Sequence, residues 1–302
     1  MLLKVEGHLA TIGFGTAAGT LARLLMLRND YRQYPGYPHG YVIHLSLGFI
    51  AAALGAVAVP AIAEPDFTAV TFLALAAQQF REVRNMERKT LEKLEELELV
   101  KRGPDYIEGM ARTFEARNYL AMGTALAVAA AYQWAGREWA AAAAFISLLA
   151  SWRLMAGRTV GAICDVVPVP LEFRGAVLTA AGVALVNVGT PEMREKILRE
   201  GLAVCLKPRD ADARATLDDL GQRMAVAHTA AVILGTKNEI DLPELTPVVR
   251  KNIDTGELVL AIVPFVRDPE ALVAAVRRAP ILESARSRPL RTGAGRAARR
   301  RG

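Results

Sequence analysis

Five apolar stretches in the first 157 residues are the feature that most constrains the fold of this chain. They cover residues 9–27, 41–63, 67–80, 119–135 and 139–155. A helix needs about 20 apolar residues, and at least about 17, to cross the hydrocarbon core of a bilayer. The first two stretches exceed that length and the last two reach it, whereas the third, with 14 residues, is marginal. The sequence therefore predicts an α-helical transmembrane domain of about five spans over residues 1–157. Within the first stretch, Gly15 and Gly19 predict a small face for close helix packing.

The distribution of Lys and Arg predicts the side of the membrane on which each connection lies, because cytoplasmic loops are enriched in these residues. Residues 81–117 carry nine of them, and the 28–40 connection carries Arg28 and Arg32. The 60–66 turn has only acids, and the 136–138 turn has a single Arg. We therefore expect a cytoplasmic helical loop at 81–117 and a cytoplasmic C-terminal part. Whether residues 67–80 cross the membrane is left open, and either answer leaves these two segments in the cytoplasm.

From residue 158 the pattern changes to short apolar runs that alternate with helical stretches. Strands are predicted at 176–179, 183–188, 202–206, 258–263 and 281–283, and a single helix at 210–235. Thr190-Pro191 and Asp268-Pro269 each predict a helix start, with a capping side chain followed by Pro in the first turn. The alternation favours a cytoplasmic α/β domain over residues 158–284, with a ferredoxin-like sandwich as one possibility.

The last 18 residues, 285–302, contain seven Arg and no acid. Removing those seven from the 37 basic residues of the chain leaves 30 against 31 acidic residues, so the net charge of +6 belongs to this tail. Such a tail suits anionic lipid or RNA. The favoured interpretation is a disordered Arg-rich end without a specific role.

The most distinctive stretch is a charged helix expected to lead into the fourth span. On a helix one face carries Asp105, Glu108, Arg112, Glu115 and Tyr119, and the other face carries Ile107, Met110, Ala111 and Phe114. An interior Gly costs about 1 kcal/mol relative to Ala, so Gly109 indicates close packing against another element. The candidate binding residues are Asp105, Tyr106, Glu108, Gly109, Arg112, Glu115 and Arg117. An equally weighted alternative is a solvated face held by pairs three and four residues apart.

This stretch carries a family resemblance. The run Tyr106-Ile107-Glu108-Gly109-Met110-Ala111 resembles the signature after which the YIEGIA family is named, with Met110 where the name has Ile. Similar runs stand at 114–119, 159–161, 191–198, 221–223, 246–247 and 280–284, so the resemblance covers roughly residues 1–284. The family consists of membrane proteins of endospore-forming Firmicutes. The resemblance implies a sporulation-associated membrane protein that works with a small soluble partner, a capping subunit. Together with the predicted spans, it leads us to expect a multi-pass protein of the bacterial cell membrane. It carries over no catalytic residues.

Two carboxylates offer an alternative function. Asp105 and Asp165 are both expected near the cytoplasmic membrane face, and two carboxylates that share a proton can activate water in a protease. No Asp-Thr/Ser-Gly triplet is present, and solvated acids are the favoured interpretation, so whether the chain is an enzyme is left open. The spacing of the histidines and cysteines fits no ligand set, and we expect neither a metal nor a cofactor.

The sequence thus predicts a membrane-anchored regulatory or assembly protein that acts through a cytoplasmic protein-binding surface. A membrane-associated protease that uses juxtamembrane carboxylates is the alternative. The expected partners are membrane lipids and a small soluble protein. Nucleic acid is not an expected partner, and the oligomeric state is left open.

Overall fold

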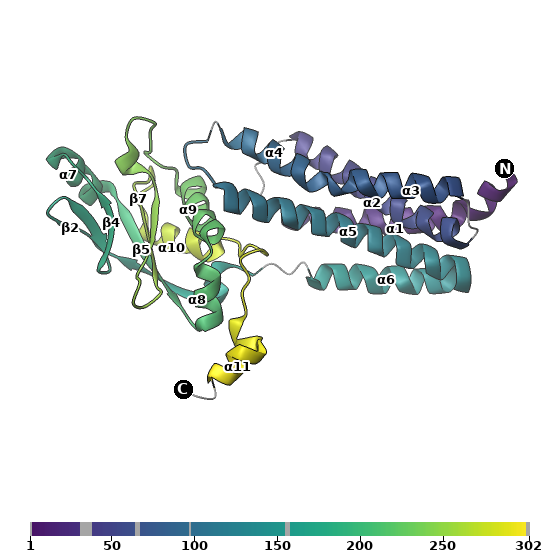
Figure 1. Ribbon diagram of the computed structural model, residues 1–302. Coiled ribbons are helices and arrows are strands. Elements are labelled where there is room, and N and C mark those ends of the chain that lie inside the picture. The colour runs from purple at the N-terminus through teal and green to yellow at the C-terminus, as the bar shows by residue number, and fades with distance from the viewer. Residues whose placement is uncertain (1, 31–37, 64–66, 97, 155–157, 300–302) are drawn as a thin grey trace. The chain divides into compact units, whose positions relative to one another are not determined.

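The structure is a computed structural model that describes residues 2–30, 38–63, 67–96, 98–154 and 158–299. By its internal contacts the chain divides into two compact units. The first unit consists of Met1–Lys89 and Met110–Gly157, and the second consists of Thr90–Gly109 and Arg158–Gly302. Helices α4 (Val83–Glu95) and α5 (Pro104–Ala135) therefore each contribute residues to both units. Figure 1 labels the helices and strands of the chain.

The described part of the first unit is helical. It contains α1 (Leu2–Asp30), α2 (Pro38–Ala63), α3 (Phe67–Arg81), the start of α4 (Val83–Glu95), most of α5 (Pro104–Ala135) and α6 (Arg137–Leu154).

Small residues bring α1 close to α5. A Cβ atom on Gly15 would lie 2.7 Å from the carbonyl oxygen of Ala125, and one on Gly19 would lie 2.6 Å from that of Ala121. The small face predicted from these two glycines therefore allows the helix backbones to approach closely.

The prediction of about five transmembrane spans is wrong. Among the described residues, two helical segments are long and apolar enough to cross a membrane, His8–Leu27 and Gly40–Ala63. Helix α3 has 15 residues, fewer than the lower limit of about 17. Helix α6 has 18 residues but includes Arg137, Glu138 and Arg153. The apolar part of α5, residues 119–135, contains seven alanines, which are only weakly apolar, together with the polar residues Thr124 and Gln133. The turns used for the orientation fall partly at 31–37 and 64–66, outside the described residues.

The second unit contains two antiparallel sheets. The first has the strand order β1-β5-β7-β6, and the second has the order β2-β3-β4. The strands are β1 (Cys164–Val169), β2 (Leu171–Arg174), β3 (Val177–Ala180), β4 (Val183–Asn187), β5 (Leu202–Pro208), β6 (Val248–Lys251) and β7 (Leu258–Ile262). The helices of the unit beyond residue 158 are α7 (Pro191–Glu200), α8 (Ala211–Leu217), α9 (Leu220–Leu234), α10 (Pro269–Arg278) and α11 (Gly293–Arg299).

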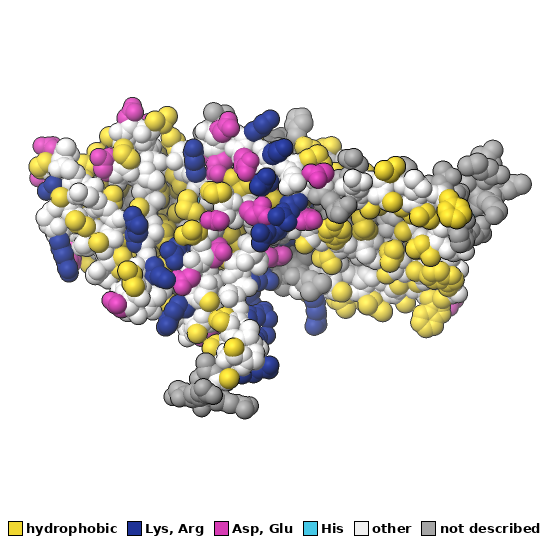
Figure 2. Space-filling model, in the orientation of Figure 1, with side chains coloured by type: hydrophobic (Ala, Val, Ile, Leu, Met, Phe, Trp, Pro, Cys, Tyr) yellow, Lys and Arg dark blue, Asp and Glu magenta, His cyan; other side chains and the backbone are white. Residues whose placement is uncertain are grey.

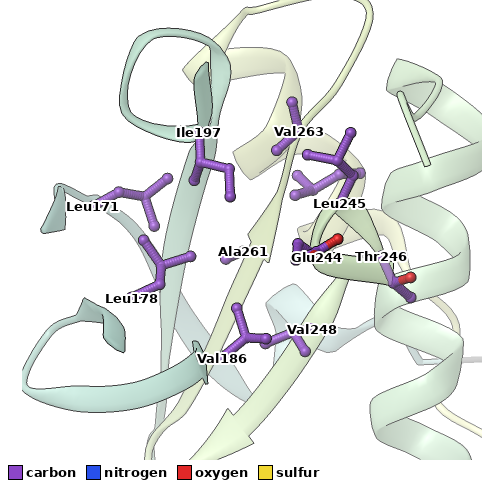
Figure 3. Close-up of a pocket in the computed structure, with 11 residues that line it drawn as sticks. Leu171, Leu178, Val186, Ile197, Glu244, Leu245, Thr246, Val248, Ala261 and Val263 are labelled. Carbon is purple, nitrogen blue, oxygen red and sulfur yellow. The ribbon is translucent and has the colours of Figure 1, made fainter. Parts of the chain in front are cut away.

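The alternation of side chains along β5 and β7 builds a core on both faces of the first sheet. Leu202, Val204 and Leu206 pack on the side of α9 and α10. Ala203 and Cys205 pack on the other side, against residues of the second sheet. Figure 3 shows apolar side chains from the second sheet, α7 and β7 pointing toward one another on this side. The gap between them holds only about 10 Å³, room for about one water, so it is a packing gap.

The ferredoxin-like topology is also wrong. Numbered along the chain, the four strands of a ferredoxin-like sheet lie in the order 4-1-3-2, whereas the four strands of the first sheet here lie in the order 1-2-4-3, as β1-β5-β7-β6. The predicted 210–235 helix is two helices, because Asp219 caps a new one by accepting a hydrogen bond from the backbone N–H of Gln222 at 2.8 Å. The predicted closing strand is a single bridge between Thr159 and Pro280.

Within the Arg-rich end, described residues form a 3₁₀ turn at Pro289–Arg291 and helix α11.

Candidate functional site

The charged stretch singled out by the sequence begins helix α5. Gly103, with φ of 81°, precedes Pro104 in the first turn, a position where its missing N–H costs nothing. Tyr106 and Ile107 are 2% and 1% exposed. Burial raises the pKa of Tyr106 to about 12, so its phenol is neutral at physiological pH. The inner face of the first turns of α5 is therefore packed in the interior of the protein.

The loop before α5 is closed by a buried carboxylate. Glu95 accepts hydrogen bonds from the backbone N–H groups of Arg102 and of Gly103, the latter at 3.0 Å. The guanidinium of Arg102 in turn donates to Glu98 at 2.6 Å. Glu95 and Arg102 are only 7% and 6% exposed. Charge-assisted hydrogen bonds of this kind are stronger than neutral ones, so the loop presents the helix start in a fixed position within its unit.

Helix α9 holds the same loop through neutral groups. His228 Nδ1 lies 3.0 Å from the carbonyl oxygen of Val100. Burial and the nearby Arg102 lower the pKa of His228, so the ring is neutral and can donate its proton from Nδ1. Just beyond α9, Asn238 donates from Nδ2 to the carbonyl oxygen of Leu99 at 3.0 Å.

Two glycines allow the helix start to touch α9 and the chain near residue 283. A Cβ atom on Gly221 of α9 would lie 3.0 Å from backbone atoms of both Asp105 and Tyr106. A Cβ atom on Gly109 would lie 2.5 Å from Ser284 Oγ. The side chain of Gln222 links α9 to the same segment through Pro280 and Leu282.

Three separate stretches of sequence thus meet in the second unit: the start of α5, the start of α9 and the segment 280–284. We call this meeting point the signature cluster, and define it by Tyr106, Gly109, Gly221, Gln222, Leu282 and Ser284. These are stretches in which the family resemblance is carried. The profile of the YIEGIA protein family matches residues 11–292.

The chain belongs to the YIEGIA family. It is also 41% identical over 271 residues to a protein of Bacillus subtilis (strain 168) described as Uncharacterized protein YphB. That similarity covers 90% of this chain and 91% of the relative. No solved structure matches the chain. The resemblance carried by the signature is therefore confirmed at the level of the family.

The structure divides the candidate binding residues of this YIEGIA protein into two groups. Tyr106, Gly109 and Arg117 are buried, and a partner could not reach them without a rearrangement. The other four follow the opposite face of α5, with Asp105 and Arg112 exposed and Glu108 and Glu115 partly exposed. The side chain of Glu115 lies 3.8 Å from Arg84 of α4.

The two candidate catalytic carboxylates sit in different surroundings. Asp165, on β1, forms an exposed ion pair with Arg209 at 2.7 Å, and the hydrogen bond from Arg209 lowers the pKa of Asp165. Asp105 lies exposed in the first turn of α5. In two carboxyl groups that share a proton, one has a raised pKa. The pKa of Asp165 is lowered instead, so it does not support a role for Asp165 as the protonated member of a protease dyad.

A second cluster of polar side chains lies inside the first unit, and the sequence interpretation missed it. Arg23 of α1 is 0% exposed. It donates from Nε to Asn118 Oδ1 of α5 at 3.2 Å and lies 5.4 Å from the centre of the Phe114 ring. His44 of α2 contacts Glu87 of α4 at 3.3 Å and the Phe114 ring at 4.5 Å. We call these five residues the buried polar cluster.

A signal for this cluster was present in the sequence. Arg23 and His44 interrupt otherwise apolar runs, and ionisable residues inside such runs usually have a structural or functional partner. Arg23 lies near one end of its apolar stretch, where an Arg side chain can reach the lipid headgroups, but its full burial makes it a central part of the helix packing.

Among the described residues, no group of three His, Cys, Asp or Glu side chains is placed to hold a metal ion. Cys164 and Cys205 are both buried. Burial raises the pKa of Cys164 to about 12 and also raises that of Cys205, which disfavours the thiolate form that binds metals.

Proposed function

We propose that this YIEGIA protein is a membrane-associated regulatory or assembly protein that binds a small soluble protein through the outer face of helix α5. The observation that carries the proposal is the division of the signature helix. Its inner face is buried in the fold, while Asp105, Glu108 and Arg112 present charge of both signs on the other face. Charged faces of this kind favour one orientation of a complementary partner and suppress others.

Helices α1 and α2 supply the membrane attachment in this proposal. In each span-length segment 39% of the residues are buried inside the structure, whereas the core helix of a soluble domain buries most of its apolar side chains. Large apolar residues such as Val42, Phe49 and Ile62 are 67%, 52% and 67% exposed. Figure 2 shows hydrophobic side chains covering much of the visible surface of the helical unit. Contact of such a surface with lipid is favourable, whereas its exposure to water is unfavourable.

The cytoplasmic side is the proposed location of the second unit. Residues 81–117, which lead into it, contain nine Lys and Arg, and such segments are retained in the cytoplasm. Membership of the YIEGIA family supports a role in sporulation and a small soluble partner, as the family resemblance implies.

The proposal is tested with charge reversals on the outer face of α5. Full-length protein carrying Glu108→Lys or Arg112→Glu is expressed in sporulating cells, and co-purified proteins are quantified against wild type. Matched controls are Glu192→Lys on α7 and Arg250→Glu on β6, both exposed and distant in sequence. We expect one small soluble protein to be depleted at least tenfold by each α5 variant and retained by both controls.

The membrane fraction of every variant is measured in parallel and is expected to match wild type. A set of co-purified proteins that is the same for the α5 variants, the controls and wild type would refute the binding role of this face. Full extraction of the wild-type chain into buffer without detergent would refute the membrane attachment.

A further inference from the structure

A cavity of about 140 Å³ in the second unit has four arginines in its wall. It lies where helix α8 and the chain just before β1 meet the segment 281–291. One water needs about 10–15 Å³ of such space, so the cavity has room for a group several times larger. The charged residues in its wall are Arg158, Arg286, Arg288, Arg291, Asp210 and Asp212.

The arginines of this cavity lack anionic partners. Among the residues that the structure describes, none of the four guanidinium groups takes part in an ion pair or a side-chain hydrogen bond. The Nε atom of Arg286 is buried and has no hydrogen-bond acceptor. An unsatisfied buried donor costs about 1–3 kcal/mol, and more when it is charged. An acceptor in the cavity would remove that cost.

The two acids in the wall are already engaged by backbone N–H groups. Asp210 caps α8 by accepting from Ala213 at 2.7 Å. Asp212 accepts from the backbone N–H of Leu290 at 3.2 Å. The formal charge of the wall, four positive and two negative residues, remains positive, and the acids fix its shape.

The segment that carries three of the arginines is held in place by α8. Besides the contact of Leu290 with Asp212, the backbone N–H of Ser287 lies 3.4 Å from Thr216 Oγ1. The arginines on either side of Ser287 are thereby kept at the cavity although they belong to the Arg-rich end of the chain. Preorganisation of this kind lowers the cost of binding an anion.

We propose that this cavity binds a phosphate group, either as free phosphate or as the headgroup of an anionic phospholipid. Guanidinium groups form planar forks that match phosphate oxygens with two parallel hydrogen bonds. The cavity size suits one such group. The site is distinct from the outer face of α5, so its failure would leave the proposed partner-binding role untouched.

The test uses the full-length protein in neutral phosphatidylcholine nanodiscs at physiological salt. Inorganic phosphate is titrated by calorimetry, and hydrogen exchange of residues 281–291 is followed with and without phosphate. A second arm uses nanodiscs that also contain phosphatidylglycerol, without added phosphate. The variants are Arg286→Gln combined with Arg288→Gln, the conservative Arg286→Lys, and the control Arg296→Gln on α11, which lies outside the cavity wall.

We expect binding that slows exchange in residues 281–291, at least a tenfold loss of affinity in the double variant, partial retention in Arg286→Lys and no change in Arg296→Gln. Protection by phosphate in neutral nanodiscs identifies a soluble ligand, and protection only with phosphatidylglycerol identifies a lipid headgroup. Absence of protection in both arms overturns the proposal. So does an equal response of the double variant, provided that exchange in β5 and β7 shows it to be folded.

Discussion

Gln222 on helix α9 holds Leu282 by accepting a hydrogen bond from its backbone N–H at 2.8 Å. The same side chain donates from Nε2 to the carbonyl oxygen of Pro280 at 2.9 Å. Gln222 is 0% exposed, so neither of its polar atoms is compensated by water. The side-chain amide of Gln222 thus connects the start of α9 to the segment 280–284, which also contacts Gly109. The residues of the signature cluster therefore form one packed and hydrogen-bonded unit.

Replacing Gln222 with Met should therefore destabilise the second unit. The new side chain keeps the approximate volume but leaves two backbone groups without partners, which costs about 1–3 kcal/mol. The loss is measured as the opening free energy of the β5 and β7 amides by native-state hydrogen exchange. Glu192→Gln, on the exposed surface of α7, is the control and should change nothing. Equal exchange in the two variants would show that the link does not stabilise the unit.

The two glycines of the signature cluster should respond differently to alanine. At Gly221 the new Cβ would meet the backbone of Asp105 and Tyr106 at 3.0 Å, which cannot move without shifting the helix, and overpacking of this kind costs about 1–3 kcal/mol. At Gly109 it would meet the hydroxyl of Ser284, an exposed side chain that can rotate away. Gly109→Ala should then gain part of the roughly 1 kcal/mol difference in helix propensity.

Both alanine variants are compared by thermal unfolding of the full-length protein in detergent, with hydrogen exchange to assign the change to the second unit. Destabilisation by Gly109→Ala equal to that by Gly221→Ala would mean that Ser284 is held rigidly.

His228 should make the second unit less stable as the pH falls from neutral. Its pKa is lowered in the folded chain by burial and by Arg102, against opposing contributions from the hydrogen bond with the Val100 backbone and from the charges of Glu98 and Glu95. The unfolded chain therefore takes up a proton near pH 6.5, which the folded chain does not accept until the pH reaches its lower pKa. Stability from this group is present above pH 6.5, declines below it, and levels off once the folded pKa is passed.

The pH effect is checked by calorimetry of wild type and His228→Asn at pH 7.5 and 5.5. The Asn amide can still donate to Val100, but it does not titrate. Wild type should lose more stability than the variant over this range, by at most about 1.4 kcal/mol per pH unit. The same pH dependence in both proteins would assign the effect to other groups.

Features that depend on neighbouring residues were predictable from the sequence. Thr190 caps α7 and Asp268 caps α10 through backbone N–H groups within the next three residues. The strands predicted at 176–179 and 183–188 form a hairpin that turns at Ala181 and Gly182, with φ of 48° and 74°, as a tight turn between antiparallel strands requires. Each of these interactions closes within a few residues, so the local sequence contains all of its parts.

Features that join distant residues were not predictable in this way. Strand β1 contains Pro168 and was not recognised, although Pro is tolerated there because β1 is an edge strand paired only with β5. The signature was found in the sequence, but its contact with Gly221 joins residues more than 100 positions apart. The number of spans was overestimated because alanine-rich helices that pack on one another resemble spans in composition.

Gly48 provides a test of the buried polar cluster, because a Cβ atom on this residue of α2 would overlap the side-chain stem of Arg23. The stem cannot simply swing aside, since the guanidinium is held at Asn118 and over the ring of Phe114. Alanine in a helix interior normally gains about 1 kcal/mol over glycine. Gly48→Ala should instead lose about 1–3 kcal/mol through overpacking.

The matched control for Gly48→Ala is Gly13→Ala on α1, where a Cβ atom would meet nothing within 4 Å. Thermal unfolding in detergent, followed by circular dichroism, should show a lower midpoint for Gly48→Ala and an unchanged or higher one for Gly13→Ala. Adding Arg23→Ala to Gly48→Ala removes the overlapping stem, so the double variant should be more stable than the sum of the two single effects predicts. Strictly additive effects would mean that Arg23 and Gly48 are not in contact, and the buried position of Arg23 would then have to be abandoned.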